Sequence, residues 1–109
     1  MMKPKLMMFA ALAAVLSLGI AGSAVAADGA ALFKSKNCIS CHGADANTPI
    51  MPIYPKLAGQ NAEYLLNQMK DIKSGARNNG QTAAMKAIIG MVSEEDMKAI
   101  ADWLSTQKP

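Results

Sequence analysis

The sequence predicts an all-α protein. Two segments, 61–75 and 93–104, place apolar residues three and four positions apart, which is the period of an amphipathic helix. No segment alternates apolar and polar residues with a period of two, so we expect no β-sheet. A chain of 109 residues has room for one domain only. We therefore expect three to five helices, two of which bury these apolar stripes: Ala62, Leu65, Leu66, Met69 and Ile72 in the first, and Met97, Ile100, Ala101 and Leu104 in the second.

The first helix and the loop that follows it are marked by their composition. Asp28 is a suitable N-cap for a helix that runs towards Lys36. The segment 43–60 is a different kind of chain, because glycine, proline, asparagine and aspartate recur along it and argue against regular structure. A loop of this length inside a small domain implies that something packs beneath it.

The later helices also have recognisable ends. Asn61 can cap the helix predicted over 61–75, and Gly75 can end it. A shorter helix is expected over 81–89. Ser93 precedes three consecutive acidic residues, which favours a helix start there, because the hydroxyl caps free N–H groups and the acids complement the helix dipole.

The N-terminal segment differs from the rest of the chain. Two lysines give it a basic start, and no charged residue occurs over 6–27. Ala24-Val25-Ala26 matches the small-residue pattern of a signal-peptide cleavage site. We predict that 1–26 is a cleaved secretory signal and that 27–109 is the mature domain, exported to the periplasm. The alternative is a retained anchor, because 22 uncharged residues can just span a bilayer.

The charge balance excludes one class of partner. The whole chain has a net charge of +3 from 11 basic and 8 acidic residues. Removing the two lysines of the leader leaves 9 basic residues against the 8 acidic ones, so the mature domain is nearly neutral. No basic patch of the kind that binds nucleic acid is present in the sequence. We expect no nucleic-acid partner.

Cys38-Ile39-Ser40-Cys41-His42 carries the chemistry of this chain. C-x-x-C-H is the attachment signature of haem c, in which both thiols add to the vinyl groups of the porphyrin and the histidine binds the iron. Cysteines three apart on a helical turn point to one side, so both sulfurs can reach one edge of a flat macrocycle. The prediction is one covalent haem, with Cys38 and Cys41 as its thioether anchors and His42 as an axial ligand.

Three other interpretations of this motif are weaker. A thioredoxin-like redox pair needs a strand-to-helix junction, and no β-branched run precedes Cys38. A structural zinc site needs four ligands, and the sequence has no further cysteine or histidine after Cys38, Cys41 and His42. A disulfide between two cysteines this close would be strained and would leave the adjacent histidine unexplained.

The second axial ligand must come from a residue other than histidine, because His42 is the only one in the sequence. Met69 and Met97 lie on the apolar stripes, where a methionine is usually a core residue. Met51 is too close to His42 in sequence to reach the opposite face of the haem readily. The residues alone leave Met85 and Met91 as equal candidates, one on each side of the short segment before Ser93.

These motifs resemble the class I c-type cytochromes of the small bacterial monohaem kind, over essentially the whole mature chain. The resemblance implies a small cytochrome c fold, with its helices wrapped around one covalently bound haem. It also implies that the methionine eight residues before the capping serine, Met85, is the iron ligand. The matching segments are 28–33, 38–43, 55–60, 64–65, 75–77 and 85–96.

The same resemblance implies roles for residues around the haem. The Pro55 carbonyl is expected to accept the second ring N–H of His42, while Leu57 and Tyr64 are expected to contact the haem. Arg77 is expected either to reach a haem propionate or to be a solvated turn residue. Phe33 is expected to contact the last helix around Ile100 and Trp103. The chain departs from the family in having four residues rather than three between Phe33 and Cys38, so we expect a bend before the motif.

A histidine–methionine iron has no open coordination position, which predicts a one-electron carrier rather than an enzyme. No second histidine or nucleophile pair suggests substrate chemistry, so no small-molecule substrate is expected. The expected partners are periplasmic or membrane-bound redox proteins that bind weakly and transiently, with the membrane involved only at such docking. The alternatives are a haem-based gas-binding or sensor protein and the cytochrome subunit of a larger dehydrogenase complex.

Overall fold

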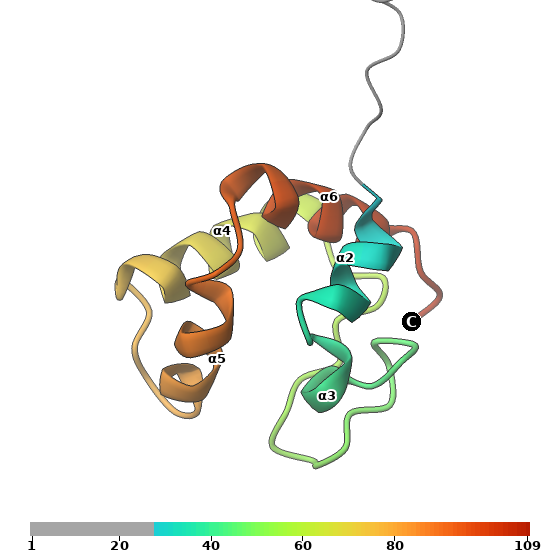
Figure 1. Cartoon of the computed structure of the whole chain (residues 1–109). Coiled ribbons are helices and arrows are strands. Elements are labelled where there is room, and N and C mark those ends of the chain that lie inside the picture. Colours follow the sequence, from blue (N-terminus) through green and yellow to red (C-terminus); the bar gives the residue numbers. More distant parts are fainter. Residues whose placement is uncertain (1–27) are drawn as a thin grey trace, which may run out of the picture.

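The structure is a computed structural model that describes residues 28–109, and the predicted signal segment lies outside the described residues. Figure 1 shows that this part of the chain is helical, and no strand occurs within it. No helix in this range is long and apolar enough to cross a membrane. The all-α prediction is confirmed, with five helices in 28–109: α2 (Gly29–Ser35), α3 (Ile39–His42), α4 (Ala62–Ser74), α5 (Thr82–Ile89) and α6 (Glu94–Ser105).

Three of the helices, α2, α4 and α6, begin at the N-caps that the sequence predicts. The side chain of Asp28 accepts a hydrogen bond from the Ala31 N–H at the start of α2. Asn61 and Ser93 do the same for α4 and α6, where they accept from the third residue along. Each cap pairs an N–H group that the first helical turn leaves without an intrahelical partner. At the other end of α4, Gly75 adopts the left-handed conformation (φ 88°) that commonly terminates a helix.

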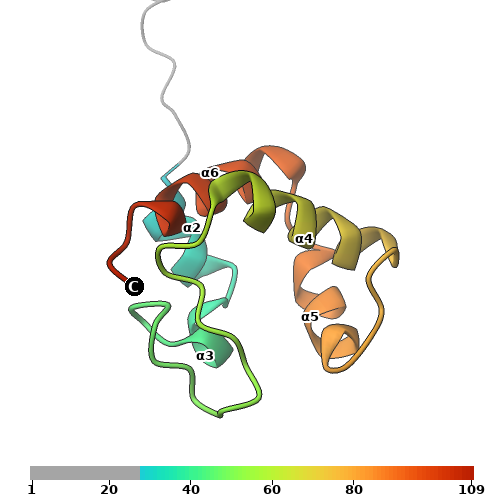
Figure 2. The same cartoon turned by 180° about the vertical axis from the view of Figure 1, so that it is seen from behind.

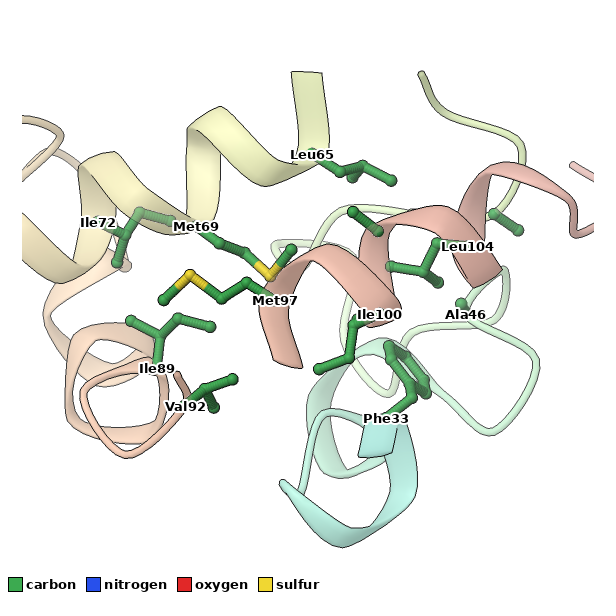
Figure 3. Close-up of a cluster of buried hydrophobic side chains, with 12 residues drawn as sticks. Phe33, Ala46, Leu65, Met69, Ile72, Ile89, Val92, Met97, Ile100 and Leu104 are labelled. Atoms are coloured by element: carbon green, nitrogen blue, oxygen red, sulfur yellow. The ribbon is translucent and has the colours of Figure 1, made fainter. Parts of the chain in front are cut away.

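The core forms where α6 crosses both α2 and α4. The four predicted stripe residues of α6 are each only 1% exposed, and the α4 residues Leu65, Met69 and Ile72 are buried opposite them. Figure 3 shows Met69 of α4 and Met97 of α6 pointing toward one another, with Ile89 and Val92 beside them. The buried residues of α4 and α6 therefore confirm the helical period read from the sequence.

α2 packs closely against the C-terminal half of α6. The rings of Phe33 and Trp103 lie 5.3 Å apart between centroids, so the terminal-helix contact expected from the resemblance is present. Gly29 permits this approach, because a Cβ atom at that position would lie 2.2 Å from the backbone oxygen of Ala99 and 2.5 Å from the Trp103 Cβ. The two helices can therefore pack this closely because Gly29 has no side chain.

The extra residue before the motif is absorbed at the end of α2. Asn37 adopts a left-handed conformation (φ 68°). The Cys38 N–H then donates to the Phe33 carbonyl (3.0 Å), and the Asn37 N–H donates to the Lys34 carbonyl (3.1 Å). These two bonds form the pattern of a Schellman motif. Asparagine is one of the few residues other than glycine that adopts this conformation readily. The expected bend is confirmed as a sharp helix end, and it directs the chain into α3.

The predicted loop over 43–60 contains no helix or strand and is organised around Ala46. Ala46 is completely buried, and its carbonyl accepts hydrogen bonds from the N–H groups of both Leu57 (2.8 Å) and Ala58 (3.1 Å). The Gly59 N–H donates to the Leu104 carbonyl (3.0 Å), which ties the loop to the end of α6. These bonds hold the second half of the loop in a fixed path beneath the core.

α5 and α3 lie on opposite sides of the molecule, below the layer that α2, α4 and α6 form in the view of Figure 1. In Figures 1 and 2, α5 hangs beneath the far end of α4, while α3 and the following loop lie below α2. Of the other helices, α5 packs chiefly against α4. The space between α5 and α3 is where the candidate site lies.

Candidate haem site

A mostly apolar cavity of about 460 Å³ lies between α3 with its loop on one side and α5 on the other. Buried residues of α4 and α6, among them Leu65, Met69 and Leu104, line it as well. Every site residue predicted from the sequence lines this cavity. They are Cys38, Cys41, His42, Pro55, Leu57, Tyr64, Arg77 and Met85.

The two cysteines reach the cavity because α3 is a single helical turn. The His42 N–H donates to the Cys38 carbonyl (3.1 Å), which sets Cys38, Cys41 and His42 on consecutive positions of that turn. Both cysteines are half-buried. Burial raises the pKa of the Cys38 thiol, against a smaller opposing effect of a backbone hydrogen bond. Cys38 and Cys41 therefore line the same mostly apolar cavity.

The zinc interpretation finds no support in the described part of the chain. Within residues 28–109, no three side chains of the His, Cys, Asp and Glu types are placed together as the ligands of one metal ion would be.

His42 is oriented by a backbone carbonyl. The residue is 7% exposed, and its Nδ1 lies 2.9 Å from the Pro55 oxygen. Because a carbonyl can only accept, Nδ1 carries the proton and Nε2 keeps its lone pair free for a metal. Burial lowers the pKa of His42, against the smaller opposing effect of the hydrogen bond to Pro55. The imidazole is thus held in the neutral form that ligates iron.

The methionines differ sharply in where they lie. Met91 is 79% exposed and Met51 is 50% exposed, and neither lines the cavity. Met97 is buried in the core away from it. Met69 and Met85 both line the cavity, but Met69 lies on α4 with its side chain directed toward Met97, as Figure 3 shows. Met85 is the methionine on α5, the element that lies across from α3.

The remaining predicted contacts lie at the rim. Tyr64 is 47% exposed, and Leu57 is half-buried. Arg77 is exposed, and its Nη1 donates to the Gln68 side chain (3.0 Å). The structure therefore places Arg77 beside the cavity in a contact with α4, so both interpretations of this residue stay open.

Sequence reasoning missed Thr82. It lines the cavity at 6% exposure, and it is the buried polar residue of α5. The signal that would have found it is its spacing. Thr82 and Met85 lie three positions apart on one helix, so they share a face. A residue one turn before a proposed ligand is therefore expected to face the same cavity.

The donors around this cavity fit a covalently attached haem. Such a group needs two thiols on one side, a neutral imidazole with a free nitrogen beside them, and an apolar enclosure. The cavity supplies these groups, and it adds a thioether sulfur on the opposing helix. A haem held by these residues would supply one-electron chemistry at its iron.

Comparisons with known proteins agree with this arrangement. The chain is 36% identical over 101 residues to cytochrome c-553 of Nitratidesulfovibrio vulgaris, a match that covers 93% of this chain and 96% of the relative. It is 44% identical over 96 residues to cytochrome c4 of Pseudomonas aeruginosa, which covers 86% of this chain but 46% of the relative. A thiosulfate dehydrogenase electron acceptor of Stutzerimonas stutzeri is 37% identical over 97 residues, with 83% and 44% covered.

The match to cytochrome c4 shows that the chain spans about half the length of that relative. A family model described as Cytochrome c matches residues 26–108, which is most of the chain and includes every residue that lines the cavity. The chain belongs to the cytochrome c family, and its cofactor is covalently bound haem c with its iron.

Proposed function

We propose that this chain is a periplasmic electron carrier that transfers single electrons between redox proteins. In this proposal Cys38 and Cys41 anchor the haem through thioether bonds, and His42 and Met85 are the axial ligands. The observation that carries the proposal is that Cys38, Cys41 and His42 at α3 and Met85 on α5 all line one cavity.

The residues explain why such a site would exchange electrons with little rearrangement. When bound, haem supplies a one-electron couple between ferric and ferrous iron. The Pro55 carbonyl fixes the orientation of His42. Met85 offers a thioether sulfur, which favours the ferrous form and raises the reduction potential. The apolar lining keeps water away from the metal. Two protein ligands leave no position for a substrate or a gas, which favours the carrier over the sensor.

The partners follow from the same chemistry. A carrier with both axial positions filled exchanges electrons at its surface, through small and short-lived contacts with redox proteins. One relative is named as the electron acceptor of a thiosulfate dehydrogenase. We propose the same class of partner here, a dehydrogenase or another redox protein of the periplasm, with the chain exported by the signal 1–26, which is then cleaved.

A spectroelectrochemical titration of the purified holoprotein tests this function. We expect one reversible one-electron transition and a low-spin spectrum in both redox states. Met85→Leu should abolish the far-red band of sulfur-ligated ferric haem and lower the potential. Met91→Leu is the matched control, because that side chain is 79% exposed and lies outside the cavity. A five-coordinate, high-spin wild-type protein, or a band that survives Met85→Leu and is lost in Met91→Leu, would contradict the proposal.

A further inference from the structure

α5 is fastened to the rest of the fold mainly at its C-terminal end. Ile89 and Val92 are 2% and 1% exposed, and Figure 3 shows them beside Ile72 and Met97 in the core. At the other end, Thr82 is buried where it lines the cavity, but the segment 76–81 that leads into α5 is exposed throughout. The position of Met85, midway along α5, therefore depends on what holds the chain near Val92.

One charged hydrogen bond holds the chain at Val92, just after the C-terminal end of α5. Lys73, in the last turn of α4, donates from Nζ to the Val92 carbonyl (2.7 Å), between residues 19 positions apart. A hydrogen bond from an ammonium group is roughly twice as strong as one between neutral groups. Val92 is almost completely buried, so losing this donor would leave a carbonyl with poor access to water. The bond joins the two ends of the segment that carries Met85.

We propose that Lys73 is a positioning residue for Met85. The inference rests on the proposed function, in which the Met85 sulfur ligates the iron. The Lys73–Val92 bond holds the C-terminal end of the segment 75–92 against α4. This contact keeps Met85 at the cavity. When the Val92 end is released, α5 loses its firm attachment and Met85 can leave the metal. Lys73 therefore controls how often the axial position opens.

Competition with added imidazole measures this opening. Imidazole binds the iron only when Met85 has left, so its apparent affinity is proportional to the fraction of open molecules. We expect ferric Lys73→Leu holoprotein to bind imidazole about tenfold more tightly than wild type, which is the change that loss of one charge-assisted hydrogen bond produces. Lys73→Arg retains a charged donor and should restore most of the wild-type affinity.

The matched control is Lys70→Leu on the same helix. Lys70 forms an exposed ion pair with Glu94 (3.1 Å) and makes no contact of this kind with the Met85 segment. Exposed pairs contribute little, so imidazole affinity should stay within about twofold of wild type. Trp103→Phe controls for lost stability, because it weakens the α2–α6 contact and should lower the melting temperature without changing imidazole affinity.

The outcomes separate this inference from the proposed function. If Met85→Leu abolishes the sulfur-ligation band but Lys73→Leu binds imidazole no more tightly than Lys70→Leu, Lys73 has no positioning role and the carrier proposal stands. If the band survives Met85→Leu, the ligand assignment itself is wrong. A gain in imidazole affinity in Trp103→Phe equal to that in Lys73→Leu would show that general destabilisation explains the effect, and it would overturn the inference.

Discussion

The Pro55 carbonyl oxygen lies 2.9 Å from Nδ1 of His42, across 13 positions of the chain. This contact links the proline-containing loop to the motif helix and determines which imidazole nitrogen is free. It also explains why a long loop without regular structure is tolerated here, since the loop supplies the group that orients a buried ring.

The first prediction concerns this hydrogen bond. Pro55→Ala keeps the carbonyl but frees its backbone, and we expect a weaker bond to His42. An imidazole with a weaker Nδ1–H partner is a poorer electron donor to ferric iron. The reduction potential should therefore rise, by about 20–40 mV if the bond weakens by about 0.5–1 kcal/mol. Protein-film voltammetry measures the shift. Pro52→Ala in the same loop is the control, and an equal rise in that variant would assign the effect to loop rigidity instead.

The second prediction concerns the contact between the terminal helices. Gly29→Ala should destabilise the protein by about 1–3 kcal/mol, although alanine favours helices, because the new methyl group would overlap the Ala99 carbonyl. The measurement is the free energy of unfolding from urea titration of the holoprotein. Ala30→Gly, at the neighbouring exposed position of the same helix, reports the helix-propensity effect alone, about 0.5–1 kcal/mol. A Gly29→Ala protein as stable as wild type would mean that α2 and α6 are not in contact as described.

The third prediction concerns pH and Asp45, at the start of the loop. Its carboxylate accepts from the N–H groups of Asn47 and Thr48 (2.9 Å each) and from the Thr48 hydroxyl (3.0 Å). The bond from Asn47 contributes most, and together these bonds lower the pKa of Asp45. A lowered folded-state pKa adds stability above the ordinary aspartate pKa, and that stability is lost as the pH falls through the folded-state value.

Asp45→Asn tests this directly. The variant should be less stable than wild type at neutral pH. The difference should shrink as the pH falls below the ordinary aspartate pKa of about 4 towards the lower folded-state pKa, because the unfolded wild-type chain then binds a proton that the folded carboxylate does not. Urea unfolding at a series of pH values measures it. A difference that is constant down to pH 3 would show that the charge of Asp45 plays no part.

The sequence was sufficient for features that depend on neighbours along the chain. Asp28, Asn61 and Ser93 cap their helices as expected, because an N-cap bonds to a residue only three positions away. The buried face of α6 follows from its apolar period alone. The attachment motif lines the cavity because its spacing is itself a local geometric requirement.

Contacts between segments far apart in the chain could not be predicted from the sequence. Nothing in the residues around Gly29 shows that Ala99 will approach it, and nothing around Ala46 shows that its carbonyl will bind two N–H groups of the loop's other end. The choice between Met85 and Met91 stayed open on the residues alone for the same reason. Their difference in exposure arises from how α5 packs under α4, a long-range arrangement.

The central claim is that one haem is bonded to the sulfurs of Cys38 and Cys41. Denaturing mass spectrometry of protein purified from a host that attaches haem tests it most directly. We predict a single species at the polypeptide mass plus one haem, with the added mass on the peptide that contains both cysteines and with no free thiol. A species at the bare polypeptide mass, with two titratable thiols and no Soret absorption, would contradict the account.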